Sequence, residues 1–362
     1  MVIRVCHVIS KIAYGGVQNT LFNYSKFVDN KKVIFDYVVY DEGDKNLENE
    51  VLKSGSRIHR VSHINNKKKY KKDLEKLFIE NEYDIVHVHL NFKNLTALRA
   101  AKKAKVKTRI SHSHSTYKVR NALIKAMRVV FKILIGFYAT HFLGCTEEAN
   151  IWLHGKRKGT SKRAFILNNA VDQQRFLFSE LEREKFRKAL NVKEEEKLLI
   201  HIGTLSENKN QAFIIKILET TQQEKFKLLL VGTGPEEKKL KEYVQEKTIK
   251  DKIIFFGNSN NVSGLLSSAD VLVFPSIYEG LSLVLVEAQA NGIPIVASNT
   301  ISKKSDITGS IVFLPLDKNI ELWTQNILKA KRTTIDIKQK IIDAGYDLEN
   351  EGARLTNFYL GC

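Results

Sequence analysis

Short apolar runs alternate with helical segments along almost the whole chain of 362 residues. An apolar run of about four to eight residues between polar or turn residues is typical of a buried strand. Strands that alternate with helices form parallel sheets, because each helix is the crossover between two strands. The predicted strands cover residues 3–9, 33–39, 57–61, 85–90, 108–111, 141–145, 165–168, 198–202, 227–231, 253–256, 271–274 and 293–297. The alternation therefore predicts an α/β protein built on parallel sheets.

The length suits two domains, because single cores stop growing well below 362 residues. We predict two consecutive doubly wound, Rossmann-like domains, residues 1–180 and 181–340. The polar stretch 173–196 is the predicted joint. A final helix over about 335–359 is late enough to return to the first domain, and residues 341–362 are assigned to that crossing.

The net charge limits the classes of binding partner, and the cysteine content indicates the cellular compartment. The net charge of +18 predicts an acidic partner, which is a nucleic acid, an anionic lipid or a phosphorylated small molecule. The three cysteines lie far apart without metal-site spacing, which is typical of a reducing cytosol. No stretch has 18 successive apolar residues, and the first residues do not read as a signal peptide. We expect a cytoplasmic protein.

Two glutamates frame an apolar segment in YEGLSLVLVEAQANGIPIVAS, residues 278–298. The segment reads as a loop, a helix over 282–291 that ends at Gly292, and a strand. Glu279 lies in the loop after strand 271–274, at the edge of a parallel sheet where ligands bind. Glu287 lies in a helix that is apolar on nearly every side, so its carboxylate needs a partner or must face a site. A salt bridge to a nearby lysine is the alternative.

Glycine-rich loops follow three of the predicted strands. Gly15 and Gly16 precede the first helix, whose N-terminus offers free N–H groups to an anion. In HIGTLSENKNQ a glycine and Lys209 take the corresponding place after strand 198–202 and suit a pyrophosphate. In LLLVGTGPEE, Gly232 and Gly234 leave room for a base or sugar ring. The alternatives are an ordinary turn for the glycine pair, a solvated loop lysine for Lys209, and for the third loop Glu236 and Glu237 as stabilisers of a helix N-terminus.

Together these motifs resemble the retaining glycosyltransferases of family 4. GGVQ, HIGTLSENKN, LVGTGP, ADVLVFPS and EGLSLVLVEAQANGIPIVAS occur in that family's order and spacing, and Glu279 and Glu287 match its glutamate pair with seven residues between them. SHSHST and ILNNAVD resemble bacterial members that build capsular or exopolysaccharide repeat units. The resemblance implies the GT-B fold, with two Rossmann-like domains and a nucleotide-sugar cleft between them. It also implies sugar transfer with retention, from a UDP-sugar to a lipid-linked or growing polysaccharide acceptor.

The resemblance implies a role for each matching residue. Glu287 accepts hydrogen bonds from the donor ribose diol, Glu279 holds hydroxyls of the transferred sugar, and Lys209 neutralises the diphosphate. His114 matches the histidine beside the donor sugar, with His112 as the rival. The implied catalytic residues are Glu279, Lys209 and His114, and the implied donor-binding residues are Gly15, Gly16, Gly203, Thr204, Lys209, Gly232, Gly234, Glu279, Gly280, Leu281, Ser282, Leu283 and Glu287.

One departure from the family weakens the donor clamp. Thr204 stands where the family usually has arginine, so two cations are reduced to one. Losing such a charge-assisted contact costs about 1.5–3 kcal/mol. Gln18 replaces a common glutamate and Ser282 a common proline, and neither bears on the chemistry. The departure at Thr204 motivates an alternative function, in which a weakly active or inactive homologue supports a partner glycosyltransferase.

No cofactor beyond the nucleotide-sugar substrate, and no metal, is expected. His87 and His89 end a predicted strand in DIVHVHL, and one of them is expected to line the cleft. No acidic residue shares their spacing, so we do not predict a metal site there. A nucleic-acid partner is not expected either, because the chain has no reading module and no aromatic stacking pattern. A sugar epimerase of the same fold would not explain the glutamate pair as well.

Residues 117–139 combine basic and large apolar side chains without an acid. The apolar residues recur near helical spacing, so the segment predicts either a core-facing helix with a solvated basic side or an interfacial helix on an anionic membrane. The basic residues assigned to the acceptor or the membrane are Arg120, Lys125, Arg128 and Lys132. Lysine clusters at 67–72 and 102–107 add charge to the same domain. We therefore expect peripheral association with the inner face of the cell membrane.

Overall fold

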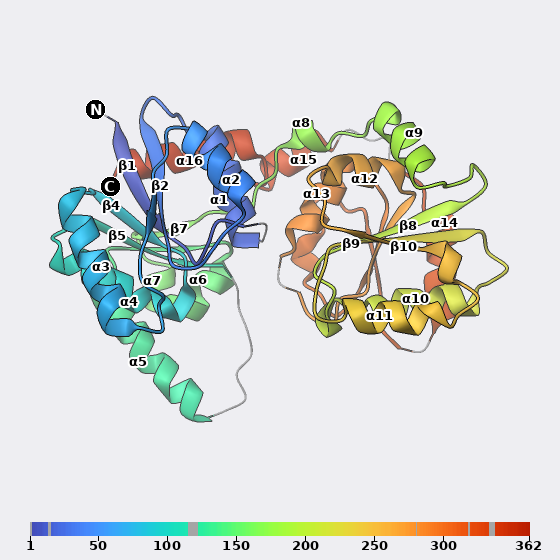
Figure 1. Ribbon diagram of the computed structural model, residues 1–362, viewed down its shortest axis with the longest axis horizontal. Helices are drawn as coiled ribbons and strands as arrows, with labels where there is room; N and C mark the ends of the chain where they lie inside the picture. Colours follow the sequence, from blue (N-terminus) through green and yellow to red (C-terminus); the bar gives the residue numbers. More distant parts are fainter. Residues whose placement is uncertain (1, 14–15, 115–121, 280, 318, 333–336) are drawn as a thin grey trace. The chain divides into compact units, whose positions relative to one another are not determined.

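The computed structural model describes residues 2–13, 16–114, 122–279, 281–317, 319–332 and 337–362. The chain divides into two compact units (Figure 1). Unit 1 comprises residues 1–170 and 348–362, and unit 2 comprises residues 171–347. The boundaries differ from the predicted ones by ten residues at the first crossing and by seven at the second.

The predicted joint, residues 173–196, lies inside unit 2. It contains the helices α8 (Gln173–Phe176) and α9 (Glu180–Ala189). Phe176 is buried in the apolar core of unit 2, and Gln173 Nε2 donates to Asp347 Oδ1 at 2.8 Å. The stretch is polar because α9 lies on the surface, so its composition resembled that of a linker.

Unit 1 is built on a parallel sheet of seven strands in the order β3-β2-β1-β4-β5-β6-β7. The strands are β1 (Ile3–Val8), β2 (Val33–Val39), β3 (Ile58–Arg60), β4 (Ile85–Val88), β5 (Thr108–Ser113), β6 (His141–Gly144) and β7 (Ala164–Ile166). The helices of this unit are α1 (Gly16–Phe27), α2 (Lys45–Lys53), α3 (Lys67–Glu80), α4 (Asn94–Lys103), α5 (Ala122–Tyr138), α6 (Glu147–His154), α7 (Lys156–Gly159) and α16 (Leu348–Leu360). Each predicted strand of this unit is present, with ends shifted by at most two residues.

Successive residues of the strands point to opposite faces of the sheet and enter two separate cores. Val5 packs with α1, α2 and α16 on one face, whereas Cys6 and Val8 pack with α3, α4, α5 and α6 on the other (Figure 1). Both faces are therefore covered, as a doubly wound sheet requires.

The C-terminal helix α16 packs against α1 in unit 1, as predicted. Gly352 permits this approach, because a Cβ at this position would lie 2.6 Å from the carbonyl oxygen of Phe27. The predicted single helix over 335–359 is wrong. The structure has two helices instead, α15 (Lys338–Asp343) in unit 2 and α16 in unit 1, separated by Gly345 with a φ of 76°. A positive φ ends a helix, and glycine adopts it without strain.

Unit 2 repeats the architecture with a parallel sheet of six strands in the order β10-β9-β8-β11-β12-β13. The strands are β8 (Lys197–Ile202), β9 (Phe226–Val231), β10 (Ile253–Gly257), β11 (Val271–Phe274), β12 (Ile295–Ser298) and β13 (Ile311–Leu314). Its further helices are α10 (Gln211–Thr220), α11 (Glu237–Gln245), α12 (Val262–Ser268), α13 (Leu283–Asn291) and α14 (Ile320–Lys329). The sequence analysis missed β13 and α14. Two Rossmann-like units confirm the predicted fold class.

Among the helices that the structure describes, none combines the length and the hydropathy needed to span a membrane.

Candidate functional site

The strand order of unit 2 reverses direction between β8 and β11. At such a point the loops after the two strands leave the sheet in opposite directions, and open parallel sheets bind ligands there. The loop after β8 contains Gly203, Thr204 and Lys209, and the loop after β11 contains Glu279. The topology thus brings four predicted donor-binding residues to one edge of one sheet.

The two loops are fastened to each other by hydrogen bonds. Asn208 Nδ2 donates to the carbonyl oxygen of Tyr278 at 2.8 Å, and the N–H of Ile277 donates to the carbonyl oxygen of Asn208 at 2.8 Å. Asn210 Nδ2 donates to the carbonyl oxygen of Pro275 at 3.3 Å. The backbone of Asn210 is left-handed, with a φ of 55°, which asparagine tolerates. The loops therefore form one scaffold for the side chains they carry.

Lys209 and Glu279 form an ion pair on this scaffold. Lys209 Nζ lies 2.5 Å from Glu279 Oε1, and each side chain is 17% exposed. The ammonium also lies 5.1 Å from the ring centroid of Phe274, within the range of a cation–π contact. Two residues that the sequence analysis assigned to catalysis are therefore in direct contact. The pair is open to solvent on one side, so a ligand can reach both charges.

Gln211 and His201 fix the loop that carries Lys209 by hydrogen bonds. The sequence analysis assigned no role to either residue. Gln211 Nε2 donates to His201 Nε2 at 3.1 Å and to the carbonyl oxygen of Thr204 at 3.0 Å. His201 Nδ1 donates in turn to the carbonyl oxygen of Val273 at 2.9 Å. Burial lowers the pKa of His201 to about 4, so the ring is neutral and can accept from Gln211. A polar residue inside the otherwise apolar strand β8 was the signal available in the sequence.

Glu287 lies in α13, partly buried. Burial raises the pKa of its carboxyl to about 7, and the charge of Arg175 in α8 opposes the rise. No hydrogen bond or ion pair of this carboxylate occurs among the residues that the structure describes. The alternative of a lysine salt bridge is therefore wrong for Glu287 among the described residues, whereas Glu279 does pair with Lys209. A carboxyl group with a raised pKa and no protein partner is typical of a binding site.

The start of α13 offers backbone N–H groups. Ser282 is the N-cap, and its side chain makes no capping hydrogen bond. The first N–H groups of a helix have no partner within the helix and attract anions. Leu281 and Leu283 flank this N-cap, and Gly280 lies outside the described residues. The predicted helix, with its end at Gly292 (φ of 72°), is confirmed within one residue.

Gly232 and Gly234 serve backbone packing. A Cβ at Gly232 would lie 2.2 Å from the carbonyl oxygen of Gly203, and one at Gly234 would lie 2.3 Å from that of Leu205. The loop after β9 therefore presses directly on the loop that carries Lys209. This contact explains the two glycines without a ligand, and their role beside a base or sugar remains a prediction.

In unit 1 the predicted site residues lie at the carboxyl edge of the sheet. Gly16 begins α1, and Gly15 lies outside the described residues. His114 directly follows β5, and its Nε2 lies 2.8 Å from Nδ1 of His89. His112 is buried, and its Nδ1 lies 3.1 Å from Nε2 of His87. The structure thus brings both candidate histidines into contact with the histidines of β4, a clustering that the separate sequence motifs did not reveal.

The basic segment forms α5, and its exposed side is apolar. The large apolar side chains at least 37% exposed on this helix are Met127, Val129, Val130, Ile133, Leu134 and Phe137. Arg128 instead packs over the ring of Trp152, at 4.3 Å from its centroid, and Lys132 is partly buried. The prediction of a basic outward face is therefore wrong for these two residues. Arg120 and the side chain of Lys125 lie outside what the structure describes.

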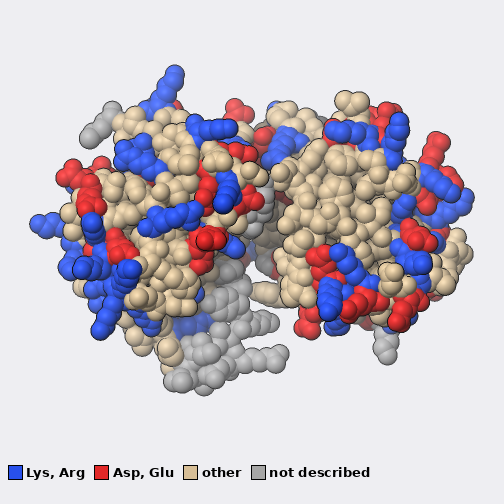
Figure 2. All heavy atoms as spheres, in the orientation of Figure 1, with Lys and Arg blue, Asp and Glu red and all other residues tan. Residues whose placement is uncertain are grey.

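The exposed basic charge of unit 1 lies elsewhere. Figure 2 shows lysines and arginines gathered over α3 and α4, next to acidic side chains. Lys71 and Lys103 pair with Glu75 there.

Comparisons with known proteins agree with this architecture. Residues 14–175 match the family described as Glycosyltransferase Family 4, and residues 182–345 match the family described as Glycosyl transferases group 1. The chain is 30% identical over 370 residues to EpsF of Bacillus subtilis (strain 168), which is named as a glycosyltransferase, covering 98% of this chain and 96% of EpsF. It is 26% identical over 316 residues to the capsular polysaccharide biosynthesis glycosyltransferase CapH of Staphylococcus aureus, covering 84% and 83% of the two chains.

Two further relatives add a substrate name and a solved structure. The UDP-Gal:alpha-D-GlcNAc-diphosphoundecaprenol alpha-1,3-galactosyltransferase of Escherichia coli is 27% identical over 239 residues, covering 62% of this chain and 60% of the enzyme. The crystal structure of HepE from Anabaena in complex with UDP superposes with a TM-score of 0.78 over 100% of both chains, at 17% identity. Because EpsF matches along nearly the whole length and the two family matches fall on the two units in order, the chain belongs to the glycosyltransferases of family 4 and has the GT-B fold.

Proposed function

We propose that this glycosyltransferase moves a sugar from a UDP-sugar to a lipid-linked or growing polysaccharide acceptor, with retention and without a metal. The observation that carries the proposal is the Lys209–Glu279 ion pair, at the point where the strand order of unit 2 reverses. The pair combines a cation for phosphate with a carboxylate for hydroxyl groups, which are the two chemistries of a nucleotide-sugar.

Donor binding changes the partners of this pair. The diphosphate carries more negative charge than Glu279, so it competes for the Lys209 ammonium. Glu279 Oε1 then becomes free to accept hydrogen bonds from hydroxyls of the transferred sugar. When the glycosidic bond to phosphate breaks, negative charge grows on the leaving diphosphate, and Lys209 stabilises it. The N–H groups at the start of α13 stabilise the same charge.

Glu287 supplies the contact to the nucleoside. Its carboxylate has no partner among the described residues, so two ribose hydroxyls can donate to it without displacing a protein group. HepE, which shares the fold, was crystallised with UDP and with UDP-glucose. This supports uracil as the base and UDP as the carrier. Retention is then assigned to attack on the same face as the leaving phosphate, which itself helps take the acceptor proton.

A lipid-linked acceptor is supported by the E. coli relative, whose name gives a diphosphoundecaprenol substrate. It is also supported by the exposed apolar side of α5 in unit 1. Six large apolar side chains on one surface helix bind well at a bilayer interface. We therefore propose peripheral association with the inner face of the cell membrane, with α5 inserted by its apolar side and the lysines of α3 and α4 adding attraction to anionic lipid.

A second candidate function rests on Thr204. This residue is exposed and holds the place of the family's arginine, so the site has a single cation for the diphosphate. A chain that binds donor weakly and transfers slowly would serve as a non-catalytic partner of another glycosyltransferase.

A donor screen tests both proposals. Calorimetry with UDP, GDP and ADP, followed by their sugars, should show binding of UDP compounds and much weaker binding of the other two. Product analysis with membrane extract should then show transfer with an unchanged anomeric configuration, also in the presence of a chelator. Binding of UDP-sugar without transfer or hydrolysis would favour the non-catalytic partner. Equal binding of the three nucleotides would contradict the UDP assignment.

A further inference from the structure

Five histidines meet at the carboxyl edge of the sheet in unit 1. None of them contributes to the Lys209–Glu279 pair of unit 2. His7 and His112 are the second-last residues of β1 and β5. His87 of β4 pairs in register with His7, and His89 and His114 directly follow β4 and β5. All five side chains point to the same face of the sheet, because they occupy alternate positions on adjacent strands. Imidazole is the commonest protein ligand for transition metals, so the cluster calls for a chemical account.

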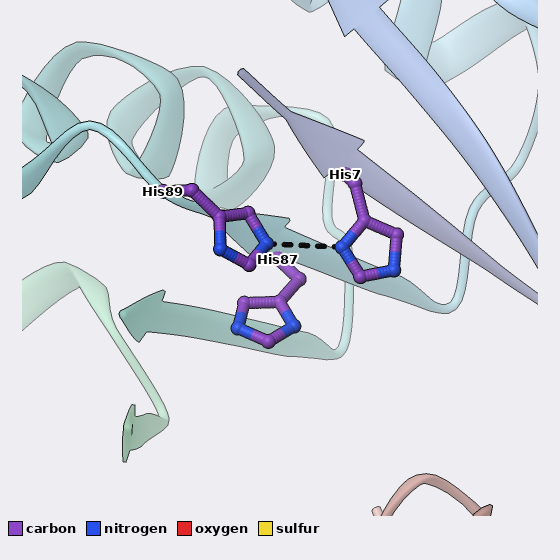
Figure 3. Close-up of side chains that lie close together, drawn as sticks. All are labelled: His7, His87 and His89. Atoms are coloured by element: carbon purple, nitrogen blue, oxygen red, sulfur yellow. Dashed lines mark hydrogen bonds between the residues drawn. The ribbon is translucent and has the colours of Figure 1, made fainter. Parts of the chain in front are cut away.

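The imidazoles form two hydrogen-bonded rows. In the first row, His7 Nδ1 lies 2.9 Å from His89 Nε2 (Figure 3), and His89 Nδ1 lies 2.8 Å from His114 Nε2. In the second row, the hydroxyl of Tyr359 lies 2.7 Å from His87 Nδ1, and His87 Nε2 lies 3.1 Å from His112 Nδ1. The two rows also touch through their rings, and His112 stacks on His114 with centroids 4.0 Å apart.

Both rows end in ring nitrogens that have no hydrogen-bond partner among the residues that the structure describes. These buried atoms are His7 Nε2, His112 Nε2 and His114 Nδ1. A buried polar atom without a partner costs free energy, and such atoms mark a functional role or a bound water or ion. Burial also lowers the pKa of every ring, to about 3 for His7 and His114. All five imidazoles are therefore neutral at pH 7, which is the form that ligates a metal.

Two triads bring ring nitrogens within 4.8 Å of one another, His7–His87–His89 and His89–His112–His114. The first triad (Figure 3) is closed to solvent, with exposed fractions of 0%, 0% and 5%. His87 Nδ1 of this triad lies 2.7 Å from the hydroxyl of Tyr359. The second triad contains two of the three unpartnered nitrogens, and His114 is partly exposed. The second triad thus has both free ligand atoms and a route from solvent.

We propose that His89, His112 and His114 form a binding site for a divalent transition metal of the zinc class. Three imidazoles bound to tetrahedral zinc place their ligating nitrogens about 3.3 Å apart. One nitrogen of each of the three residues already lies within 4.8 Å of the others, so rotations of the side chains complete the set. The fourth position is left to water. Because the triad contains no carboxylate, it discriminates against magnesium, calcium and manganese, which prefer oxygen ligands.

Metal binding itself is the test of this site, and it can be measured without sugar transfer. The full chain without a histidine tag is stripped with a chelator and titrated with Co²⁺, whose tetrahedral complexes absorb visible light strongly. We expect saturation at one equivalent, displacement by one equivalent of Zn²⁺, and no effect of excess Mg²⁺. The titration is repeated on Cys362→Ser, because Cys362 is an exposed thiol that also binds metal.

Variants locate the site. His112→Gln and His114→Gln should each weaken Co²⁺ binding at least tenfold. His59→Gln is the matched control, because it removes an imidazole of the same unit that lies outside the cluster, where its Nε2 contacts the hydroxyl of Tyr83, and it should change the affinity less than twofold. Thermal unfolding checks that each variant is folded. X-ray absorption of the zinc-loaded natural chain needs no variant and should show three imidazole ligands.

Absence of the Co²⁺ absorption from the natural chain would overturn the proposal. A loss with His59→Gln that equals the loss with His114→Gln would also overturn it, and so would fewer than three imidazoles in the absorption spectrum.

Discussion

The two units place different chemistry at the same edge of the same kind of sheet. Unit 2 places a cation and an anion there, Lys209 and Glu279, in contact at 2.5 Å and open to solvent. Unit 1 places five neutral imidazoles there, four of them almost wholly buried. Charges stay ionised when they are paired and solvated, whereas buried imidazoles become neutral. The comparison shows that strand order determines where a site lies. Solvent access then determines whether the side chains of that site are charged or neutral.

The largest effect is expected from breaking the charged pair. Lys209→Ala should lower kcat/KM for sugar transfer by about 10²–10³-fold, because a fixed cation is lost from the developing diphosphate charge. The variant also leaves Glu279 without its partner. Steady-state kinetics measure the loss.

Lys239→Ala is the matched control for this change, since Lys239 pairs with Glu236 on the exposed surface of the same unit. Its kinetics should equal those of the natural chain. A similar loss of kcat/KM in both variants would show that Lys209 acts only through the overall positive charge of unit 2 and not through a contact in the site.

Glu287→Ala tests the unpaired carboxylate of unit 2. We expect the dissociation constant for UDP to rise at least tenfold while the fold persists, because apolar packing holds the rest of α13. Calorimetry gives the affinity and thermal unfolding checks the fold. An unchanged affinity for UDP would mean that the carboxylate is structural.

The raised pKa of Glu287 predicts a pH dependence in a range where the neutral histidines of unit 1 do not titrate. The carboxylate accepts hydrogen bonds only when ionised, and its pKa is about 7 without ligand. UDP affinity should therefore fall as pH decreases through 7, by about tenfold between pH 8 and pH 6. Glu287→Gln should remove this slope. A slope that persists in Glu287→Gln would assign it to another group.

Thr204→Arg should increase the positive charge at the carboxyl edge of the sheet in unit 2, where unit 1 has neutral imidazoles. The change adds a second cation beside the diphosphate, so donor affinity should rise by up to about tenfold at low ionic strength. The gain should shrink as salt is added, because Thr204 is exposed. Calorimetry in a salt series measures both effects. Weaker binding would show that the loop differs from the family's geometry.

The smallest effect is expected at the membrane. Changing Ile133 and Phe137 to asparagine removes the two most exposed apolar side chains among those of α5 that the structure describes, at 62% and 65%. Pelleting with phosphatidylglycerol vesicles should fall severalfold. Leu181→Asn is the control, because Leu181 is 75% exposed but lies in unit 2. Equal pelleting of all three proteins would contradict a role of α5.

The sequence was sufficient to predict the alternation of elements, because buried parallel strands are continuous apolar runs that any packing preserves. It failed where the outcome depended on contacts between distant segments. Strand β13 (Ile311–Leu314) was missed although its run IVFL is as long and as apolar as the run VLVF of β11, so the pattern was sufficient there. The break between α15 and α16 depends on the backbone of Gly345, which a periodic pattern does not reveal.

For the candidate site, too, local motifs were predictable from the sequence and contacts between distant segments were not. Lys209 and Glu279 were assigned separately from motifs, whereas their contact arises from the adjacency of β8 and β11. Gln211 was missed because its two hydrogen bonds reach back along the chain to a strand and a loop. The histidine cluster was also missed as a unit, since its members are up to 107 positions apart and only the register of β1, β4 and β5 aligns them.

The helix α16 makes unit 2 an insertion within unit 1, and this order has a consequence for synthesis on the ribosome. Residues 171–347 are complete before the last 15 residues emerge, so unit 2 can finish folding while unit 1 still lacks a helix. Until then the apolar face that receives Leu355 and Tyr359 stays uncovered, and His87 lacks its tyrosine partner. A premature stop near the C-terminus would therefore damage the unit that was made first, and a nascent chain stalled there would be a target for chaperones and proteases.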